Sequence, residues 1–269
     1  MLEKVQGMVI QGASTQNVLP SSTSSPWEPA LIGATIGFVG AITAQIVSHF
    51  FTQRRETQKF NKEIYQNLFA PVLLDVYSYL DIVTHFRKHH DLKYGVNESD
   101  FRDKIINHIG TNLKYASPNL ILSYEAVLRN DYEEDFSGYL SSISDLDLML
   151  QFLDDLYELN QRTKLFDEAK TRKVNQYRVL YLIWVFLARY ESLGVEKSAF
   201  QVAYKFYFSN ERLTAKFYDE VNNFTGDKRE KLNYILKSLI REEYTNEVND
   251  VFFQNNLRMS MNNSIKRFK

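Results

Sequence analysis

The longest apolar segment of the chain lies near its N-terminus. Between Ala30 and Phe51, twenty-two positions carry no Asp, Glu, Lys or Arg. At a rise of about 1.5 Å per residue, a helix of that length measures about 33 Å, close to the roughly 30 Å hydrocarbon core of a bilayer. The pattern predicts a transmembrane helix at residues 30–52. Residues 1–29 are rich in Ser, Thr, Asn and Gln, which predicts a disordered extracytoplasmic tail.

The charges on either side of this segment predict its orientation. Glu28 precedes it, and the four positive charges that follow it are Arg54, Arg55, Lys59 and Lys62. Because positive charge collects on the cytoplasmic side of membrane helices, we expect the N-terminus outside and residues 53–269 in the cytoplasm. The four basic side chains would then meet lipid headgroups. A cleaved signal peptide carries its positive charge ahead of the apolar core, so the order found here argues against one.

Small residues recur within the apolar segment. Gly33, Gly37 and Ala41 are four residues apart and so share one helix face. Small side chains at this spacing let two helices approach closely in lipid, which predicts self-association of the span. A polar stripe is formed by Gln45, Ser48 and His49, and it supports a second hypothesis, an oligomeric pore or membrane-disrupting protein lined by these side chains.

After residue 53 the apolar positions recur with the period of a helix, and no alternating pattern predicts a strand. We therefore expect an all-α fold, with the span running on to the breaker Pro71 and a multi-helix cytoplasmic domain at residues 53–269. Helix starts are indicated by Asn97 or Ser99, by Ser117 before Pro118, and by Asp227.

Two further apolar patterns concern the centre and the end of this domain. Val179–Ala188 holds ten uncharged residues, about half of what a membrane span requires, so we expect a central core helix there. Apolar positions from Leu232 to Val251 predict a single helix of more than six turns that begins at Asp227.

The amino-acid composition of the chain argues against several classes of partner and site. Lys and Arg total 32 and Asp and Glu total 33, so the net charge of −1 gives no reason to expect a nucleic-acid partner. The chain has no cysteine, which excludes disulfides and thiolate metal sites. Glycine-rich phosphate loops and nucleophile elbows are also missing from the sequence. We expect no cofactor.

Histidines and carboxylates were considered as metal ligands. His85 and His89 are four residues apart and could share a helix face toward zinc, but a third ligand is not apparent, and a helix C-terminus explains them better. Acidic side chains cluster at four positions, namely Asp145, Asp147, Asp154 and Asp155. They lack the Glu-x-x-His pairing of metal sites in helical bundles, so we expect them on solvated helix faces.

Aromatic residues are dense around the predicted core helix, where Tyr177, Tyr181, Trp184 and Phe186 occur within ten positions. They could form a groove for a peptide or an apolar ligand. Since aromatic side chains on helices mostly fill interiors, core packing is the interpretation that we favour.

One short motif carries a catalytic hypothesis. In FRDKIINHIG, Arg102 is followed by five residues and then His108. This spacing resembles the motif of HEPN ribonucleases, all-helical domains in which a dimer places paired Arg and His around an RNA phosphate. The resemblance implies that Arg102 stabilises the phosphoryl charge and that His108 transfers protons.

Taken together, the patterns predict a single-pass membrane protein that acts by binding rather than by catalysis. We expect a scaffold, a sensor or an exclusion or abortive-infection type of effector at the inner membrane face, the last by analogy of layout alone. Membrane lipid, a second copy of the chain and a protein of unknown identity are the expected partners. The ribonuclease with Arg102 and His108 and the pore are the alternatives.

Overall fold

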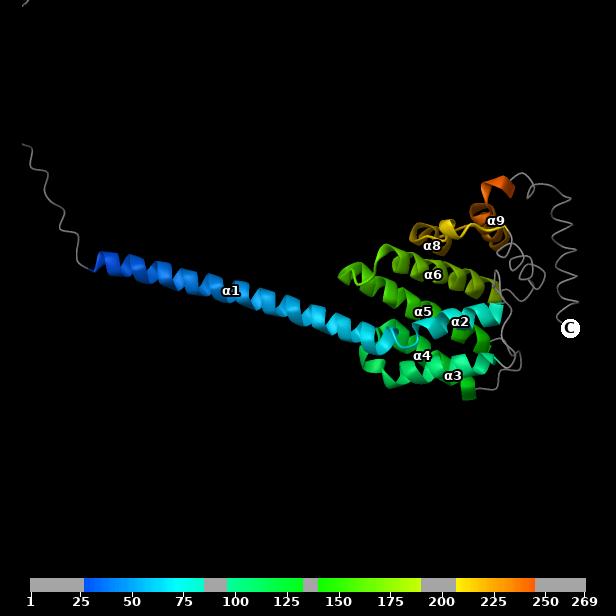
Figure 1. The fold of residues 1–269 in the computed structure, drawn as a ribbon, viewed down its shortest axis with the longest axis horizontal. Coiled ribbons are helices and arrows are strands. Elements are labelled where there is room, and N and C mark those ends of the chain that lie inside the picture. The colour runs from blue at the N-terminus through cyan, green and yellow to red at the C-terminus, as the bar shows by residue number, and fades with distance from the viewer. Residues whose placement is uncertain (1–26, 85–95, 133–139, 190–206, 245–269) are drawn as a thin grey trace, which may run out of the picture. The chain divides into compact units, whose positions relative to one another are not determined.

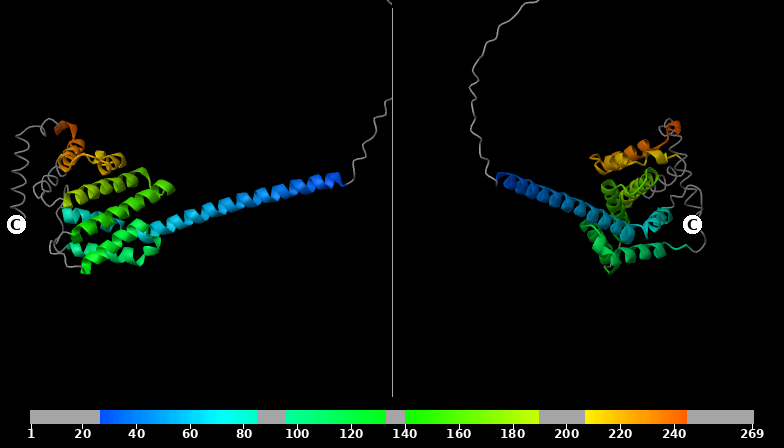
Figure 2. Two further views of the ribbon diagram at one scale, coloured as in Figure 1. Left: turned by 180° about the vertical axis from the view of Figure 1, so that it is seen from behind. Right: turned by 60° about the vertical axis from the view of Figure 1, so that its left-hand side comes forward.

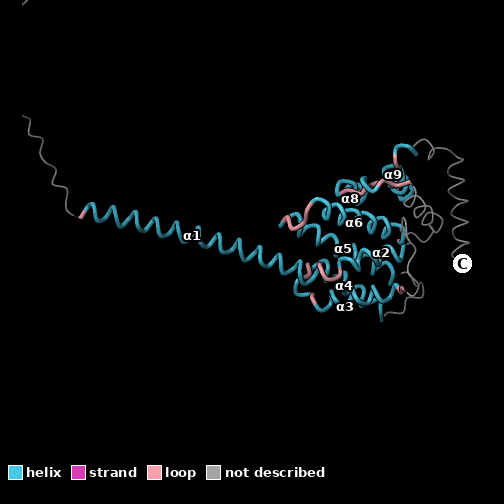
Figure 3. The backbone as a smooth tube through the Cα atoms, viewed as in Figure 1, coloured by secondary structure: helices cyan, strands magenta, loops and turns pink. Residues whose placement is uncertain are grey.

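The structure is a computed structural model that describes residues 27–84, 96–132, 140–189 and 207–244. The chain divides into two units, residues 1–55 and residues 56–269, and each is described by itself. Within the described residues every regular element is helical, as Figure 3 shows, and the backbone pairing outside helices is limited to one bridge between Phe208 and Ile240. The prediction of an all-α fold is confirmed.

The first helix, α1, extends unbroken over Glu28–Ile64 (Figure 1). Within the described part of the chain it is the one helix long and apolar enough to cross a membrane, judged by length and composition. Every residue from 34 to 60 is exposed. The apolar stretch is therefore exposed from residue 34 to residue 51.

The described residues of the second unit form a bundle of helices. Its first elements are η1 (Tyr65–Phe69, a π-helical turn), α2 (Leu73–Thr84), α3 (Glu98–Thr111), η2 (Leu113–Tyr115), α4 (Pro118–Tyr132), α5 (Leu140–Thr163) and α6 (Glu168–Ala188). Helix α5 packs between α4 and α6, and α2 packs on both α3 and α6 (Figure 2). The later elements are η4 (Asn210–Arg212), α8 (Ala215–Asn222), α9 (Lys228–Leu239) and η5 (Glu242–Tyr244), with α8 against α6.

The predicted helix starts are found with their caps in place. The side chain of Asn97 accepts a hydrogen bond from the backbone N–H of Ser99 at 3.3 Å, and Ser117 accepts one from Leu120 at 3.1 Å. At α9 the carboxylate of Asp227 accepts from the N–H of Glu230, and Glu230 accepts in turn from the N–H of Asp227. Each cap satisfies amide groups that the first helical turn leaves without a partner.

Helix α6 is the core helix that the sequence predicts. From Val179 to Ala188 every side chain is buried except that of Phe186, which is half-buried. The hydroxyl of Tyr181 is fully enclosed and donates to the carbonyl of Val76 on α2 at 2.6 Å. Core packing is thus confirmed for Tyr181 and its aromatic neighbour Trp184.

The predicted single helix after Asp227 is wrong, because α9 ends at Leu239. Ile240 is extended there, and the N–H of Arg241 donates to Tyr207 while Ser209 donates to the carbonyl of Leu239. The guanidinium of Arg212 also donates to the carbonyls of Ser238 and Ile240. These partners, which are distant in sequence, satisfy the carbonyl groups at the helix end. The spacing of apolar residues along the helix gives no information about them.

Candidate functional site

The face of α1 expected to self-associate is exposed at Gly37 and Ala41. A methyl group built on Gly37 would meet no atom within 4 Å, and the same holds for Gly40. Ala41 is exposed, and Gly33 lies in the same helix, one turn before Gly37. Gln45, Ser48 and His49 are exposed as well, so the pore hypothesis stays a prediction.

Three threonine hydroxyl groups of α1 are satisfied within the helix. Thr35 donates to the carbonyl of Leu31, Thr43 to that of Val39, and Thr52 to that of Ser48, at 2.8, 2.8 and 2.9 Å. Bonding back to the carbonyl four residues earlier removes the need for water at these side chains. Lipid would therefore leave none of these three hydroxyl groups without a partner.

The basic residues that follow the apolar stretch are exposed on α1. Arg54, Arg55, Lys59 and Lys62 all face solvent, and Lys59 lies 4.0 Å from Glu63 across one helical turn. Exposed pairs of this kind contribute little to stability. The four cations are therefore available to an anionic surface.

The π-helical turn η1 attaches the end of α1 to the bundle. Tyr65 accepts a hydrogen bond from Lys170 of α6, and Asn67 donates to the hydroxyl of Tyr115 in η2. The carbonyl of Leu68 lies 3.2 Å from Nε2 of His108 on α3. Phe69 adds a ring contact with Phe152 of α5, with ring centroids 4.9 Å apart. Three side chains and one backbone carbonyl of this five-residue turn thus contact four separate elements of the bundle.

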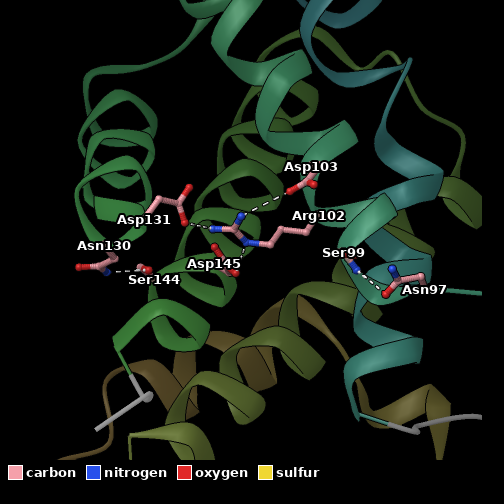
Figure 4. Close-up of polar contacts among 8 residues, drawn as sticks. All are labelled: Asn97, Ser99, Arg102, Asp103, Asn130, Asp131, Ser144 and Asp145. Atoms are coloured by element: carbon pink, nitrogen blue, oxygen red, sulfur yellow. Dashed lines mark hydrogen bonds and ion pairs between the residues drawn. The ribbon is translucent and has the colours of Figure 1, made fainter. Parts of the chain in front are cut away.

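Arg102 occupies the centre of an ion cluster between α3, α4 and α5 (Figure 4). Its guanidinium contacts Asp145 of α5 through Nε and Asp131 of α4 through Nη2, both at 2.6 Å, and Asp103 at 3.5 Å. Its side chain is 20 % exposed, while that of Asp145 is 6 % exposed. Beside it, Asn130 donates to Ser144 and ties α4 to α5 again.

Burial and ion pairing both change the pKa values in the Arg102 cluster. It raises the pKa of Asp145, and the hydrogen bond and charge of Arg102 act in the opposite direction. Burial also raises the pKa of Glu98, with the charge of Asp145 adding to the effect. For Arg102, burial favours a lower pKa, but the contacts with Asp145 and Asp131 prevail and raise it. The guanidinium therefore stays charged and bound to carboxylates that already occupy three of its nitrogens.

The two residues of the ribonuclease motif contact different parts of the bundle. Arg102 contacts acids of α4 and α5, whereas His108 contacts the backbone of η1. Six residues along a helix correspond to a rotation of about 240°, so the two side chains leave α3 in different directions. The contacts of each residue are explained by packing of the bundle, and the ribonuclease hypothesis stays a prediction without structural support.

The expectation of solvated faces is wrong for three of the four clustered acids. Asp155 is half-buried and its Oδ2 is enclosed. Asp145 is buried in the Arg102 cluster, and Asp154 is half-buried beside Arg178 of α6, with Arg178 Nε 2.8 Å from Asp154 Oδ1. The guanidinium of Arg178 lies between the rings of Tyr157 and Tyr218, 3.9 and 4.0 Å from their centroids. Sequence reasoning missed this contact, although an arginine directly before the apolar run of α6 signals a need for a buried partner.

Asp147 and Asp155 are the other two acids of the set, and both accept hydrogen bonds from side chains. Asp147 accepts two hydrogen bonds from Arg189, and Asp155 accepts one from Gln151. His85 and His89 lie outside the described residues. Among the residues that the structure describes, no group of three or more His, Asp or Glu side chains could hold a metal ion.

Comparison with protein-family models, with curated proteins and with solved structures finds no match for this chain.

Proposed function

We propose that this protein is a single-pass membrane protein whose helical domain acts by binding at the cytoplasmic face of the membrane. The main support is the apolar surface of α1, in which every residue from 34 to 60 is exposed. Large apolar side chains such as Ile36, Phe38 and Ile46 are between 64 and 68 % exposed. A soluble protein rarely exposes so continuous an apolar surface, and lipid is the medium that matches it.

The proposed orientation rests on the charges at the end of the apolar stretch. Arg54, Arg55, Lys59 and Lys62 would lie in the cytoplasmic headgroup region, where each contributes about 1 kcal/mol of attraction to anionic lipid. The tail at residues 1–29 would then lie outside. The helical domain would then lie in the cytoplasm, which suits a scaffold or a sensor.

The experiment that tests location and orientation uses introduced thiols. Because the chain has no cysteine, each substitution creates a unique label site. In intact cells a membrane-impermeant maleimide should label Ser24→Cys and should leave Lys216→Cys, an exposed position of α8, unlabelled until the cells are opened. Recovery of the protein in the supernatant after high-speed sedimentation would refute the membrane location, and labelling of Lys216→Cys in intact cells would refute the orientation.

We further propose that the Gly33, Gly37 and Ala41 face pairs two copies of the span. Since a side chain at Gly37 meets nothing in the monomer, Gly37→Leu should leave the fold intact and should weaken pairing through close helix approach. Cross-linking of single-cysteine variants in membranes should be strongest on this face and should fall in the Gly37→Leu background. Ile42→Leu on the opposite face is the matched control, and uniform cross-linking around the helix would refute the pairing.

A further inference from the structure

Gln45 carries an amide group within the charge-free stretch of α1. It lies fifteen positions after Ala30 and six before Phe51, and its side chain is exposed. At about 1.5 Å per residue it would lie about 7 Å from the middle of the span, inside a hydrocarbon core of about 30 Å. Water does not solvate a side chain at that depth, so an amide without a partner there is costly.

Gln45 differs from the threonines of the same stretch in its hydrogen bonding. Thr35 and Thr43 each donate to the backbone carbonyl four residues earlier, at 2.8 Å. Among the residues that the structure describes, none forms a hydrogen bond with the side chain of Gln45. An amide offers two N–H donors and a carbonyl acceptor. Its partner in lipid must therefore come from another molecule and must offer both a donor and an acceptor.

Gln45 also continues a row of small residues. Gly33, Gly37 and Ala41 precede it at intervals of four, so the four positions form one ridge along the helix. Ridges of this spacing meet when two membrane helices cross at about −40°. The small residues let the backbones approach closely, and a methyl group added at Gly37 would meet no atom within 4 Å. The ridge can therefore bring an identical helix within reach of the amide.

We infer that the amide of Gln45 binds the amide of Gln45 in a second copy of the chain, and that this bond fixes the register of two parallel spans. Copies inserted in the same orientation are related by a two-fold axis, so equivalent positions lie at the same depth and face each other. Each amide then donates to the carbonyl of the other. The inference rests on the proposed pairing of the spans and names the residue that aligns them.

The distribution of polar residues favours a pair over a pore. Gln45, Ser48 and His49 all lie in the last two turns of the charge-free stretch. Earlier on the same ridge, Gly37 and Ala41 offer no polar side chain. A water-filled pore needs polar groups along its length. A bond between two amides needs only one polar position on the ridge.

Energy transfer between labelled copies tests the inference. The full-length protein carries one introduced cysteine, Lys216→Cys, at an exposed position of α8, for donor and acceptor dyes. It is reconstituted into phosphatidylcholine vesicles, and the dissociation constant of the pair is measured as lipid is added. Gln45→Leu has a similar volume without the amide and should raise this constant about fivefold, as expected for one hydrogen bond between membrane helices.

Mixed pairs distinguish a mutual bond from general packing. Wild-type copies with the donor and Gln45→Leu copies with the acceptor should pair as weakly as Gln45→Leu does with itself, because the single amide lacks a partner both in the mixed pair and alone. Thr43→Val is the matched control. It removes a hydroxyl group that is already bonded within its own helix, and it should change the dissociation constant by less than about twofold.

The possible results separate this inference from the proposed pairing. A mixed pair of intermediate strength, equal constants for Gln45→Leu and the wild type, or equal effects of Gln45→Leu and Thr43→Val would each overturn the amide bond. The pairing itself would survive these results if Gly37→Leu still weakened it. No energy transfer between wild-type copies would overturn both proposals. Release of a trapped dye from the same vesicles would show that Gln45 faces water in a pore, and would also overturn the inference.

Discussion

Helices α1 and α6 are both long and both contain an uncharged apolar stretch, yet their surroundings differ completely. The stretch in α1 covers twenty-two residues and is exposed, whereas that in α6 covers ten residues and is buried among α2, α5 and α8. Ile42 of α1 is 42 % exposed, and Ile183 of α6 is 0 % exposed. Apolar composition alone therefore does not decide whether a helix belongs to a protein core.

The two helices differ in whether they carry a charged side chain at their apolar stretch. Helix α6 contains Arg178, which is buried with a carboxylate, an amide and two aromatic rings around it. The apolar stretch of α1 contains no charge, and its threonines bond to their own helix. A protein interior can supply partners for a charged group, but the hydrocarbon core of a bilayer cannot. The comparison makes α1 a membrane helix in our proposal and α6 a core helix.

The largest expected effect comes from adding charge to α1. Phe38→Arg together with Ile42→Arg should reduce membrane insertion strongly, since each arginine near the centre of a span costs about 3 kcal/mol. The measurement is the fraction of protein that resists alkaline carbonate extraction. Leu74→Arg together with Leu122→Arg, at positions of the helical domain that are 73 and 63 % exposed, is the control and should change nothing. An unchanged membrane fraction for the α1 variant would show that this helix does not reside in lipid.

A slightly smaller effect is expected from removing the charge of Arg178, the buried arginine of α6. Arg178→Leu should destabilise the domain by about 4 kcal/mol, because Asp154 loses its cation in a half-buried position. Urea unfolding can be followed by the fluorescence of the buried Trp184 in a Trp27→Phe background. Adding Asp154→Leu should recover part of the loss. Arg172→Leu, which breaks an exposed pair on the same helix, should cost less than about 0.5 kcal/mol.

Truncation of one isoleucine in each helix tests the comparison directly. Ile183→Ala should lower the free energy of unfolding of the domain by about 3 kcal/mol, since it leaves a cavity in a fully enclosed site. Ile42→Ala should leave that free energy unchanged within about 0.5 kcal/mol. Both values come from the same urea titration. Equal losses would mean that α1 packs against the domain as a core helix does.

The smallest effect concerns Asp155, a half-buried acid of α5. Burial raises the pKa of Asp155, while donors from Ser117 and Gln151 act in the opposite direction. A raised native pKa means that the folded state binds the proton more tightly, so the ionised form reduces stability as the pH rises above the unfolded value of about 4. Asp155→Asn should remove this loss, and its stability relative to the wild type should increase between pH 4 and pH 7, by less than about 1 kcal/mol. If the stability of Asp155→Asn relative to the wild type instead decreased from pH 4 to pH 7, the pKa of Asp155 would not be raised in the folded state.

Much of the fold could be predicted from local patterns. The caps at Asn97, Ser117 and Asp227 are recognisable because each acts within three residues of itself. The core helix around Ile183 could be predicted because ten apolar residues are too few for a span and too many for a surface. Both signals depend on neighbours in the chain.

The end of α9 and the ion clusters could not be predicted in this way. Apolar periodicity continues past Leu239, but Arg212 and Tyr207 provide partners for the backbone that end the helix there. The sequence around Asp145 suggests a solvated helix face. Asp145 is buried nevertheless, because it pairs with Arg102, forty-three positions earlier in the chain.

The sequence by itself determined the all-α character of the chain, the caps of its helices and the position of its long apolar, charge-free segment at residues 30–51. These properties follow from short-range hydrogen bonding and from side-chain polarity, which are encoded within a few turns of helix. Only the tertiary structure decided which charges are buried and where α9 stops. Each of those outcomes depends on side chains that are distant in sequence and that meet only when the helices pack.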